Sequence, residues 1–282
     1  MSILSPEELS ALDRLQISSR RAVLGRRQGI HRSNKRGSGL EFSEFKQYTP
    51  GDDFRAIDWN TSARTDKLYS KLYREEQDLT LVIVLDLSNS LFIGGNILLA
   101  KKLALSLAYI TIKSGDKVSL VIPGRAQTRA SSKPSSFHLM SRLLEETKEA
   151  NSEEITPAIK LAPSQNKLPG KVVLISDYLF NLNTVEESLL YISNKNYQAT
   201  LLSLDYEKEE GEGTFIDSET EEEIERELSE QDQIQLQRLR TIHFQELNRI
   251  AAHYKSDYIQ VKKDANILDI IYSDLINSRV LT

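Results

Sequence analysis

The sequence of 282 residues contains no cysteine, which excludes a disulfide framework and a thiolate metal site. It has four histidines, and none stands at a spacing typical of a zinc site or a catalytic base. No apolar run approaches the roughly 20 residues that span a bilayer. The N-terminal stretch MSILSPEELSALDRL also lacks the charged-then-apolar layout of a secretory signal. These absences predict a cytoplasmic protein without membrane insertion.

The net charge of −5 hides a strong asymmetry along the chain. Residues 1–40 carry eight lysines and arginines against three acids, whereas residues 205–230 carry thirteen acids against two bases. A basic arm is compatible with nucleic acid or with an acidic partner, but charge runs more often form solvated surface. We therefore favour a solvated surface and do not expect nucleic acid as a partner.

The chain is organised around the stretch Thr80 to Ser90, TLVIVLDLSNS. It begins as an apolar, β-branched run, which is typical of a strand buried on both faces of a parallel sheet. It then places Asp86, Ser88 and Ser90 at alternate positions on a turn. Because ligands of open α/β sheets bind outside the carboxyl ends of the strands, this tip is a candidate polar site.

From residue 79 onward, strand and helix patterns alternate, which predicts a doubly wound, mostly parallel α/β sheet covered by helices on both faces. We assign this domain to residues 79–282, with an acidic insertion at 205–230 that contains a hairpin or loop near 214–217. The expected strands cover 81–85, 117–122, 127–130, 171–176, 199–204 and 258–261. The expected helices cover 96–114, 137–150, 156–161, 185–193, 232–254 and 267–277.

Residues 1–78 form an N-terminal satellite region of helix and short strands. A helix is expected over 6–27, a loop over 28–40, a Pro-Gly turn at 48–52 and a strand over 67–73. Three acidic residues of this region, Asp52, Asp53 and Asp58, have two interpretations. They are nuclease-like metal ligands, or they anchor Arg55 and Arg64 in a structural polar network, which we favour because charged groups that leave water need partners.

Two of the expected strands end in aspartate, at Asp86 and Asp177. Their carboxylates meet at one sheet edge if both strands are central, and two like charges at close range repel unless a cation lies between them. Carboxylate and hydroxyl oxygens suit Mg²⁺, Mn²⁺ or Ca²⁺. The alternative is that Asp86 caps the following turn and Ser90 caps a helix. We favour a metal site.

The segment Asp86–Ser90, DLSNS, resembles the D-x-S-x-S motif of the metal-ion-dependent adhesion site in von Willebrand factor A domains. In that family two serines and one or more aspartates bind Mg²⁺, and a second loop supplies a threonine and a third an aspartate. The resemblance therefore implies a metal set of Asp86, Ser88, Ser90 and Asp177. Thr156 is the nearest threonine for the second loop, although counting back from the following helix places Glu153 there.

The stretch before the strand resembles the bacterial domain-of-unknown-function family fifty-eight, and this resemblance covers about residues 20–280. The segment FIDSET at 215–220 is similar to that family's hairpin after the fifth strand. Members of the family are typically encoded beside MoxR-type AAA+ ATPases and are thought to act with them as adaptors or co-chaperones. The matching positions are Gly37, Gly39, Glu41, Phe42, Tyr48, Gly51, Asp52, Arg55, Asp58, Trp59 and Arg64.

These observations predict a non-enzymatic interaction module. A Mg²⁺-occupied site would accept a carboxylate from a MoxR-type ATPase or from a client protein. The alternative from another class is a metal-dependent phosphatase or nuclease with Asp86 as nucleophile, but such phosphatases place a second acid where this chain has Ser88. A third alternative is nucleic-acid binding by the basic arm, which requires an affinity that falls steeply with salt.

Overall fold

The computed structural model describes residues 3–17, 40–49, 52, 54, 57–65, 67–75, 79–93, 95–147, 170–204, 214–216, 223–225, 230–262, 265–278 and 280–281. The chain divides into two compact units. The sheet unit comprises Met1–Ser18 and Leu79–Thr282, and the satellite unit comprises Ser19–Asp78. Each unit is described below by itself.

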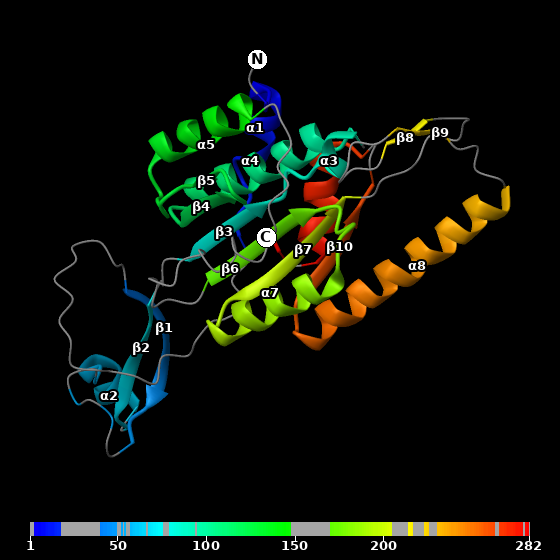
Figure 1. Ribbon diagram of the computed structural model, residues 1–282. Helices are drawn as coiled ribbons and strands as arrows, with labels where there is room; N and C mark the ends of the chain where they lie inside the picture. Colours follow the sequence, from blue (N-terminus) through cyan, green and yellow to red (C-terminus); the bar gives the residue numbers. More distant parts are fainter. Residues whose placement is uncertain are drawn as a thin grey trace. The chain divides into compact units, whose positions relative to one another are not determined.

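The sheet unit is built on a six-stranded sheet in the order β10-β7-β6-β3-β4-β5 (Figure 1). Its strands are parallel except β5, which runs antiparallel to β4. The central strand β3 consists of β-branched and leucine residues that are all buried, as expected for a strand covered on both sides. The strands are β3 (Thr80–Leu85), β4 (Lys117–Ile122), β5 (Ala126–Gln127), β6 (Gly170–Ser176), β7 (Gln198–Leu204) and β10 (Asp257–Val261).

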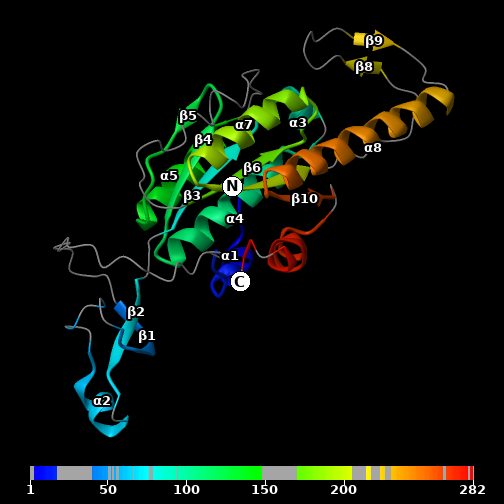
Figure 2. The same cartoon turned by 90° about the horizontal axis from the view of Figure 1, so that it is seen from below.

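Helices cover both faces of this sheet because successive side chains of a strand point to opposite faces. Leu81, Ile83 and Leu85 belong to one apolar cluster, with residues of α1, α3, α4, α5 and the C-terminal helices. Val82 and Val84 belong to a second cluster, with residues of α7 and α8. Figures 1 and 2 show these two layers on either side of the sheet. The helices are α1 (Pro6–Leu12), α3 (Asn89–Ile93), α4 (Ile97–Lys113), α5 (Pro134–Glu146), α7 (Leu182–Asn194), α8 (Glu230–His253), α9 (Ile267–Asp269) and the π-helix η2 (Ile270–Leu275).

The N-terminal helix α1 packs in the sheet unit. Leu4 and Leu12 are buried in the cluster that includes α4. Glu8 forms an ion pair with Lys102, and Asp13 forms one with Lys113. Residues 3–17 therefore belong to the sheet unit, whereas the sequence analysis assigned them to the satellite region. The contacts that hold them join residues far apart in the sequence, and such contacts produce no local sequence pattern.

The satellite unit contains an antiparallel pair of strands, β1 (Leu40–Gln47) and β2 (Tyr69–Glu75), with the helix α2 (Trp59–Thr65) between them in sequence. The register shifts between Phe42 and Glu44, which marks an irregularity in β1. The Asp58 carboxylate accepts the Thr61 N–H at 2.9 Å and so caps the first turn of α2. The sequence predicted β2 but not β1.

The predicted fold class is confirmed: the sheet is mostly parallel, and helices cover both of its faces. The predicted strand at 117–122 and helix at 96–114 match β4 and α4 closely. The predicted final helix at 267–277 is instead a short α-helix that continues as η2. In the acidic insertion the short strands β8 (Thr214–Ile216) and β9 (Glu223–Glu225) pair as a hairpin. The helix predicted at 156–161, the basic residues at 18–39 and the rest of the insertion lie outside the described residues.

Candidate functional site

The candidate site lies where the order of the strands reverses. From β3 the chain proceeds to β4 and β5 on one side, and then returns to β6, β7 and β10 on the other. The reversal falls between β3 and β6, which is where open α/β sheets place their ligand sites. Asp86 and Asp177 directly follow these two strands. Because β3 and β6 are adjacent and parallel, the two aspartates lie at the same edge of the sheet, as predicted.

Asp86 is held by hydrogen bonds from both strands. Its backbone N–H donates to Ile175 O at 2.9 Å and extends the β3–β6 ladder by one residue. Its Oδ1 accepts the Ser88 N–H at 2.9 Å, and its Oδ2 accepts the Ser176 hydroxyl at 2.7 Å. Oδ1 of Asp86 thus caps the following turn, while Oδ2 is hydrogen-bonded to Ser176 at the end of β6.

The two serines of the motif lie beside the aspartates. The hydroxyls of Ser88 and Ser90 are 3.0 Å apart, and both residues are half-buried. The Ser90 hydroxyl hydrogen-bonds the Asp177 carboxylate. Asp177 Oδ1 also accepts the Leu179 N–H at 3.2 Å. The structure therefore brings together four of the predicted site residues: two carboxylates and two hydroxyls.

Burial disfavours the charged form of both carboxylates, because Asp86 is 5% exposed and Asp177 is 3% exposed. Burial, with a smaller contribution from the charge of Asp177, raises the pKa of Asp86 to about 6 in spite of the lowering effect of the Ser176 hydrogen bond. Burial also raises the pKa of Asp177, which the Ser90 hydrogen bond and, more weakly, the charge of Arg240 oppose. The hydrogen bonds from neutral donors therefore do not offset the desolvation that raises the pKa of these two carboxylates.

Three residues of the site escaped the sequence analysis. Ser176 donates to Asp86 and accepts the Tyr178 N–H at 2.9 Å. Tyr178 has a left-handed backbone, with φ of 57°, and its buried hydroxyl donates to Leu174 O. His243 of α8 donates from Nε2 to Tyr178 O at 2.7 Å, so this nitrogen carries a proton. Ser176 had a detectable signal, since it lies two residues beyond the buried Leu174 and shares its face, but the His243 contact depends on how α8 packs.

The donor set at this edge fits a hard divalent cation. Among the described residues, no group of three or more histidine, aspartate or glutamate side chains could hold a metal ion. The site offers instead two carboxylates and two hydroxyls, all of which are oxygen donors suited to Mg²⁺. Thr156 and Glu153, the two candidates for the second loop, lie outside the described residues.

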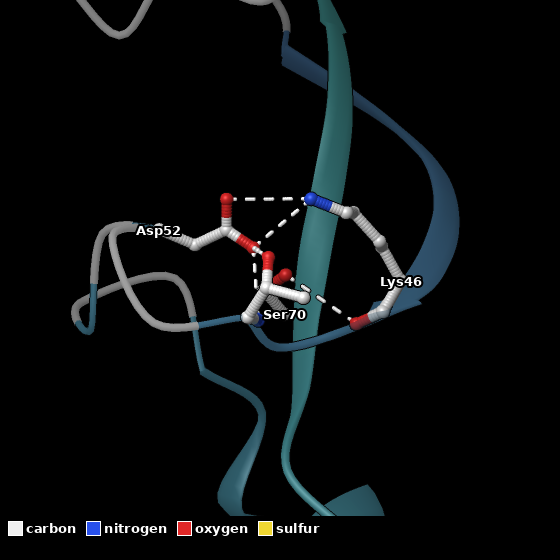
Figure 3. Close-up of polar contacts among 4 residues, drawn as sticks. Lys46, Asp52 and Ser70 are labelled. Carbon is white, nitrogen blue, oxygen red and sulfur yellow. Dashed lines mark hydrogen bonds and ion pairs between the residues drawn. The ribbon is translucent and has the colours of Figure 1, made fainter.

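The aspartates of the satellite unit have structural roles. Asp52 accepts hydrogen bonds from Lys46 Nζ and from the backbone and side chain of Thr49 (Figure 3). The Lys46 and Thr49 hydrogen bonds lower the pKa of Asp52 to about 2. Asp58 caps α2, as described above. The favoured structural interpretation thus agrees with both residues, although Lys46 takes the place expected for an arginine; Asp53 and Arg55 lie outside the described residues.

Three solved structures resemble the chain. BatB from Bacteroides thetaiotaomicron aligns with a TM-score of 0.45 at 19% identity, over 71% of this chain and 98% of its own. An aerotolerance-related membrane protein from Bacteroides fragilis aligns at 0.42 and 18%, over 72% and 98%. The VWA domain of SpRpn10 aligns at 0.40 and 10%, over 71% and 94%. The fold class rests instead on the strand order and the two helical layers, which are those of a doubly wound, mostly parallel α/β sheet.

The predicted cytoplasmic location is contradicted by these comparisons. The Bacteroides fragilis protein is described as a membrane protein, so the cytoplasmic prediction is not retained. A location depends on segments and signals that a sheet domain does not carry, so the composition of this domain was poor evidence for it. Within the described residues, no helix combines the length and the apolar character required to cross a bilayer.

A family model, rather than a single relative, gives the family. The uncharacterized protein Rv1480 from Mycobacterium tuberculosis is 27% identical over 188 residues, which cover 63% of this chain. The match spans 59% of that relative's length. The profile of a family described as "Protein of unknown function DUF58" matches residues 44–243, which include α2, the Asp86–Ser90 motif, Asp177 and His243. The chain belongs to the DUF58 family.

Proposed function

We propose that the sheet unit is a metal-dependent protein-interaction module. A divalent cation, Mg²⁺ or its relatives Mn²⁺ and Ca²⁺, would be held by Asp86, Ser88, Ser90 and Asp177, with Thr156 or Glu153 from the second loop. When bound, the cation supplies a positive charge with exchangeable coordination positions, one of which a partner's carboxylate can occupy. The chain's own residues orient the oxygens and exclude bulk water.

The observation that carries the proposal is the pair of buried carboxylates at the strand reversal. Among the described residues, the hydrogen bonds to Asp86 and Asp177 come from neutral groups, namely serine hydroxyls and backbone N–H groups. Burial and the neighbouring charge of Asp177 both disfavour the ionised form of Asp86 and raise its pKa, and the charge of Arg240 acts on Asp177. A bound divalent cation would remove the repulsion between the two carboxylates.

Binding is favoured over hydrolysis by the surroundings of the pair. Position 88, where a phosphatase of this type would carry its second acid, is a serine that donates its N–H to Asp86. His243 is the histidine near this edge in the described part of the chain, and its Nε2 proton is donated to Tyr178 O. It is therefore engaged in holding the loop rather than placed as a base. We propose no catalytic residue.

The partner that we propose is a MoxR-type AAA+ ATPase or a client protein that such an ATPase remodels. This proposal rests on the family and on the carboxylate-accepting chemistry of the site. It is tested by co-expressing the chain with a MoxR-type ATPase encoded beside it and capturing the chain in Mg²⁺ or in a chelator. Retention in Mg²⁺ alone, lost with Asp86→Asn, is expected; retention that ignores both metal and substitution would contradict it.

The metal itself is tested by thermal unfolding in the presence of Mg²⁺, Mn²⁺ or Ca²⁺. A ligand that binds the folded state at one hundred times its Kd stabilises it by about 2.7 kcal/mol. We expect at least one of these ions to raise the melting temperature of the wild type, and Asp86→Asn to abolish the rise.

The matched control is Asp52→Asn. Asp52 is also an aspartate with bonded carboxylate oxygens, but it lies in the satellite unit and pairs with Lys46. This variant should respond to metal as the wild type does. The metal site is rejected if none of the three ions shifts the wild type, or if Asp86→Asn and Asp52→Asn lose the response equally.

A further inference from the structure

The first half of α8 is exposed almost all round. Between residues 231 and 242 no side chain is buried, and ten of the twelve residues are exposed. The second half is different, because Leu247, Ile250 and Ala251 are buried against the sheet. In both views the N-terminal part of α8 extends beyond the ends of the strands (Figures 1 and 2). Among the described residues of the sheet unit, none buries a side chain of this segment, which is about 18 Å long.

This projecting segment is unusually apolar for an exposed helix. Ile234 is 61% exposed, Leu236 43%, Leu239 55% and Ile242 53%. Single exposed apolar residues are ordinary on protein surfaces, but here four lie within nine positions of one helix, and exposed apolar patches mark interaction sites. We name Ile234, Leu236, Leu239 and Ile242 the α8 patch.

The α8 patch lies at the same edge of the sheet as Asp86 and Asp177. The His243 bond to Tyr178 O fixes α8 one residue beyond Asp177. One turn earlier, the charge of Arg240 acts on the Asp177 carboxylate. Leu239 therefore stands about 6 Å along the helix axis from His243, and Leu236 about 10 Å. Leu179, two residues after Asp177, is 46% exposed and adds apolar surface at this edge.

The charge of this region differs from that of the chain. Residues 233–245, QIQLQRLRTIHFQ, contain Arg238 and Arg240 and no aspartate or glutamate, whereas the whole chain has a net charge of −5. Arginine with leucine and isoleucine is complementary to a surface that combines acidic and apolar side chains. An acidic partner surface of this kind would also supply the carboxylate that the proposed metal site accepts.

A protein fits this surface better than a membrane does. At 100° per residue the α8 patch spreads over roughly 200° of the helix circumference, whereas a helix that lies on a bilayer confines its apolar residues to one face. A protein partner can enclose several sides of a projecting helix.

We propose that the α8 patch and Leu179 form the apolar half of one partner surface, whose polar half is the Asp86–Asp177 site. Its occupant is an acidic protein segment that places one carboxylate at the metal and packs apolar side chains around the first half of α8. This inference rests on the proposed function of the site and adds the chemistry of the partner.

The test uses a random peptide library displayed on phage and selected against the full chain in Mg²⁺. The enriched peptides are synthesised, and their binding is measured by fluorescence anisotropy. We expect sequences in which an acid neighbours leucine, isoleucine or an aromatic residue. Leu236→Gln/Leu239→Gln should weaken their binding roughly tenfold or more, since buried apolar anchors dominate such interfaces. Glutamine is a good helix former, so α8 remains intact.

The matched control is Leu139→Gln on α5, because Leu139 is 51% exposed and Leu239 is 55% exposed. This variant should bind the peptides as the wild type does. Peptides that require Mg²⁺ and Asp86 but tolerate Leu236→Gln/Leu239→Gln would overturn the inference and leave the proposed function standing. Peptides that require the α8 patch but neither Mg²⁺ nor Asp86 would overturn both.

Two further outcomes also overturn the inference. The first is that no peptide is enriched on the wild type above its enrichment on Leu236→Gln/Leu239→Gln. The second is co-sedimentation of the wild type with phosphatidylcholine–phosphatidylglycerol vesicles that the same double substitution abolishes, because the α8 patch would then serve a membrane surface.

Discussion

Two aspartates of this chain are bonded in opposite ways, and the difference separates a structural carboxylate from a candidate ligand. In the satellite unit, Asp52 is neutralised by Lys46, and its pKa falls to about 2 (Figure 3). At the sheet edge, Asp86 is buried among neutral donors beside a second carboxylate, and its pKa rises to about 6. Asp52 has its cation within the chain, whereas the hydrogen bonds to the Asp86 carboxylate come from the Ser88 N–H and the Ser176 hydroxyl, which are neutral.

The largest effect is expected from the pH dependence of Asp86 in the metal-free protein. The pKa of Asp86 in the folded state lies above its ordinary value of 3.8, so the folded state keeps a proton that the unfolded state releases. Stability is therefore lost as the pH rises from about 4 to about 6, by about 3 kcal/mol in total. Asp86→Asn removes this loss and should stabilise the metal-free protein above pH 6.

The measurement is urea unfolding in a chelator across this pH range, followed by far-ultraviolet circular dichroism. The wild type and Asp86→Asn should converge near pH 4 and diverge above it. Parallel curves for the two proteins across the range would mean that Asp86 does not carry an unfavourable buried charge, and the contrast with Asp52 would collapse.

A smaller effect is expected from Ser176→Ala. This change removes the hydroxyl that donates to Asp86 Oδ2 and accepts the Tyr178 N–H. Loss of this hydrogen bond to a buried carboxylate should lower the free energy of unfolding by about 1–3 kcal/mol at neutral pH. The same unfolding assay measures it. Ser70→Ala in the satellite unit, where the hydroxyl reaches Lys46 O at 3.4 Å, is the comparison and should cost less.

The smallest effect is expected from Asp52→Asn, and its sign with pH is opposite to that of Asp86. Because the folded pKa of Asp52 is depressed to about 2, its contribution is present above about 4 and is lost as the pH falls toward 2. Asp52→Asn should reduce the loss of stability between about pH 4 and pH 2 and leave the stability at higher pH dependent on pH as in the wild type. Trp59, the single tryptophan, lies in α2, so its fluorescence reports on the satellite unit. An unchanged loss of stability in this range would show that the Lys46 bond carries no stability.

The sequence predicted those features that follow from short periodic patterns. The apolar run at β3 and its polar tip identified a central strand and Asp86, and parallel pairing then implied that Asp177 ends at the same edge. Contacts that depend on how the elements pack could not be predicted from the sequence. The Ser176 bond requires the register of β3 and β6, and the His243 bond requires the placement of α8. Leu12 belonged to the predicted helix at 6–27, but the sequence pattern did not indicate that it packs in the cluster that includes α4.

The left-handed backbone of Tyr178 has a consequence for the speed of binding. A bulky residue at φ 57° is strained, and three hydrogen bonds hold Tyr178 in this conformation. Its N–H donates to Ser176 Oγ, its hydroxyl donates to Leu174 O, and its carbonyl accepts from His243 Nε2. The energetic cost of this conformation therefore falls on folding and not on association. Whatever binds beside Asp177 meets a loop that is already in place, so its association rate is set by encounter and electrostatic steering rather than by rearrangement.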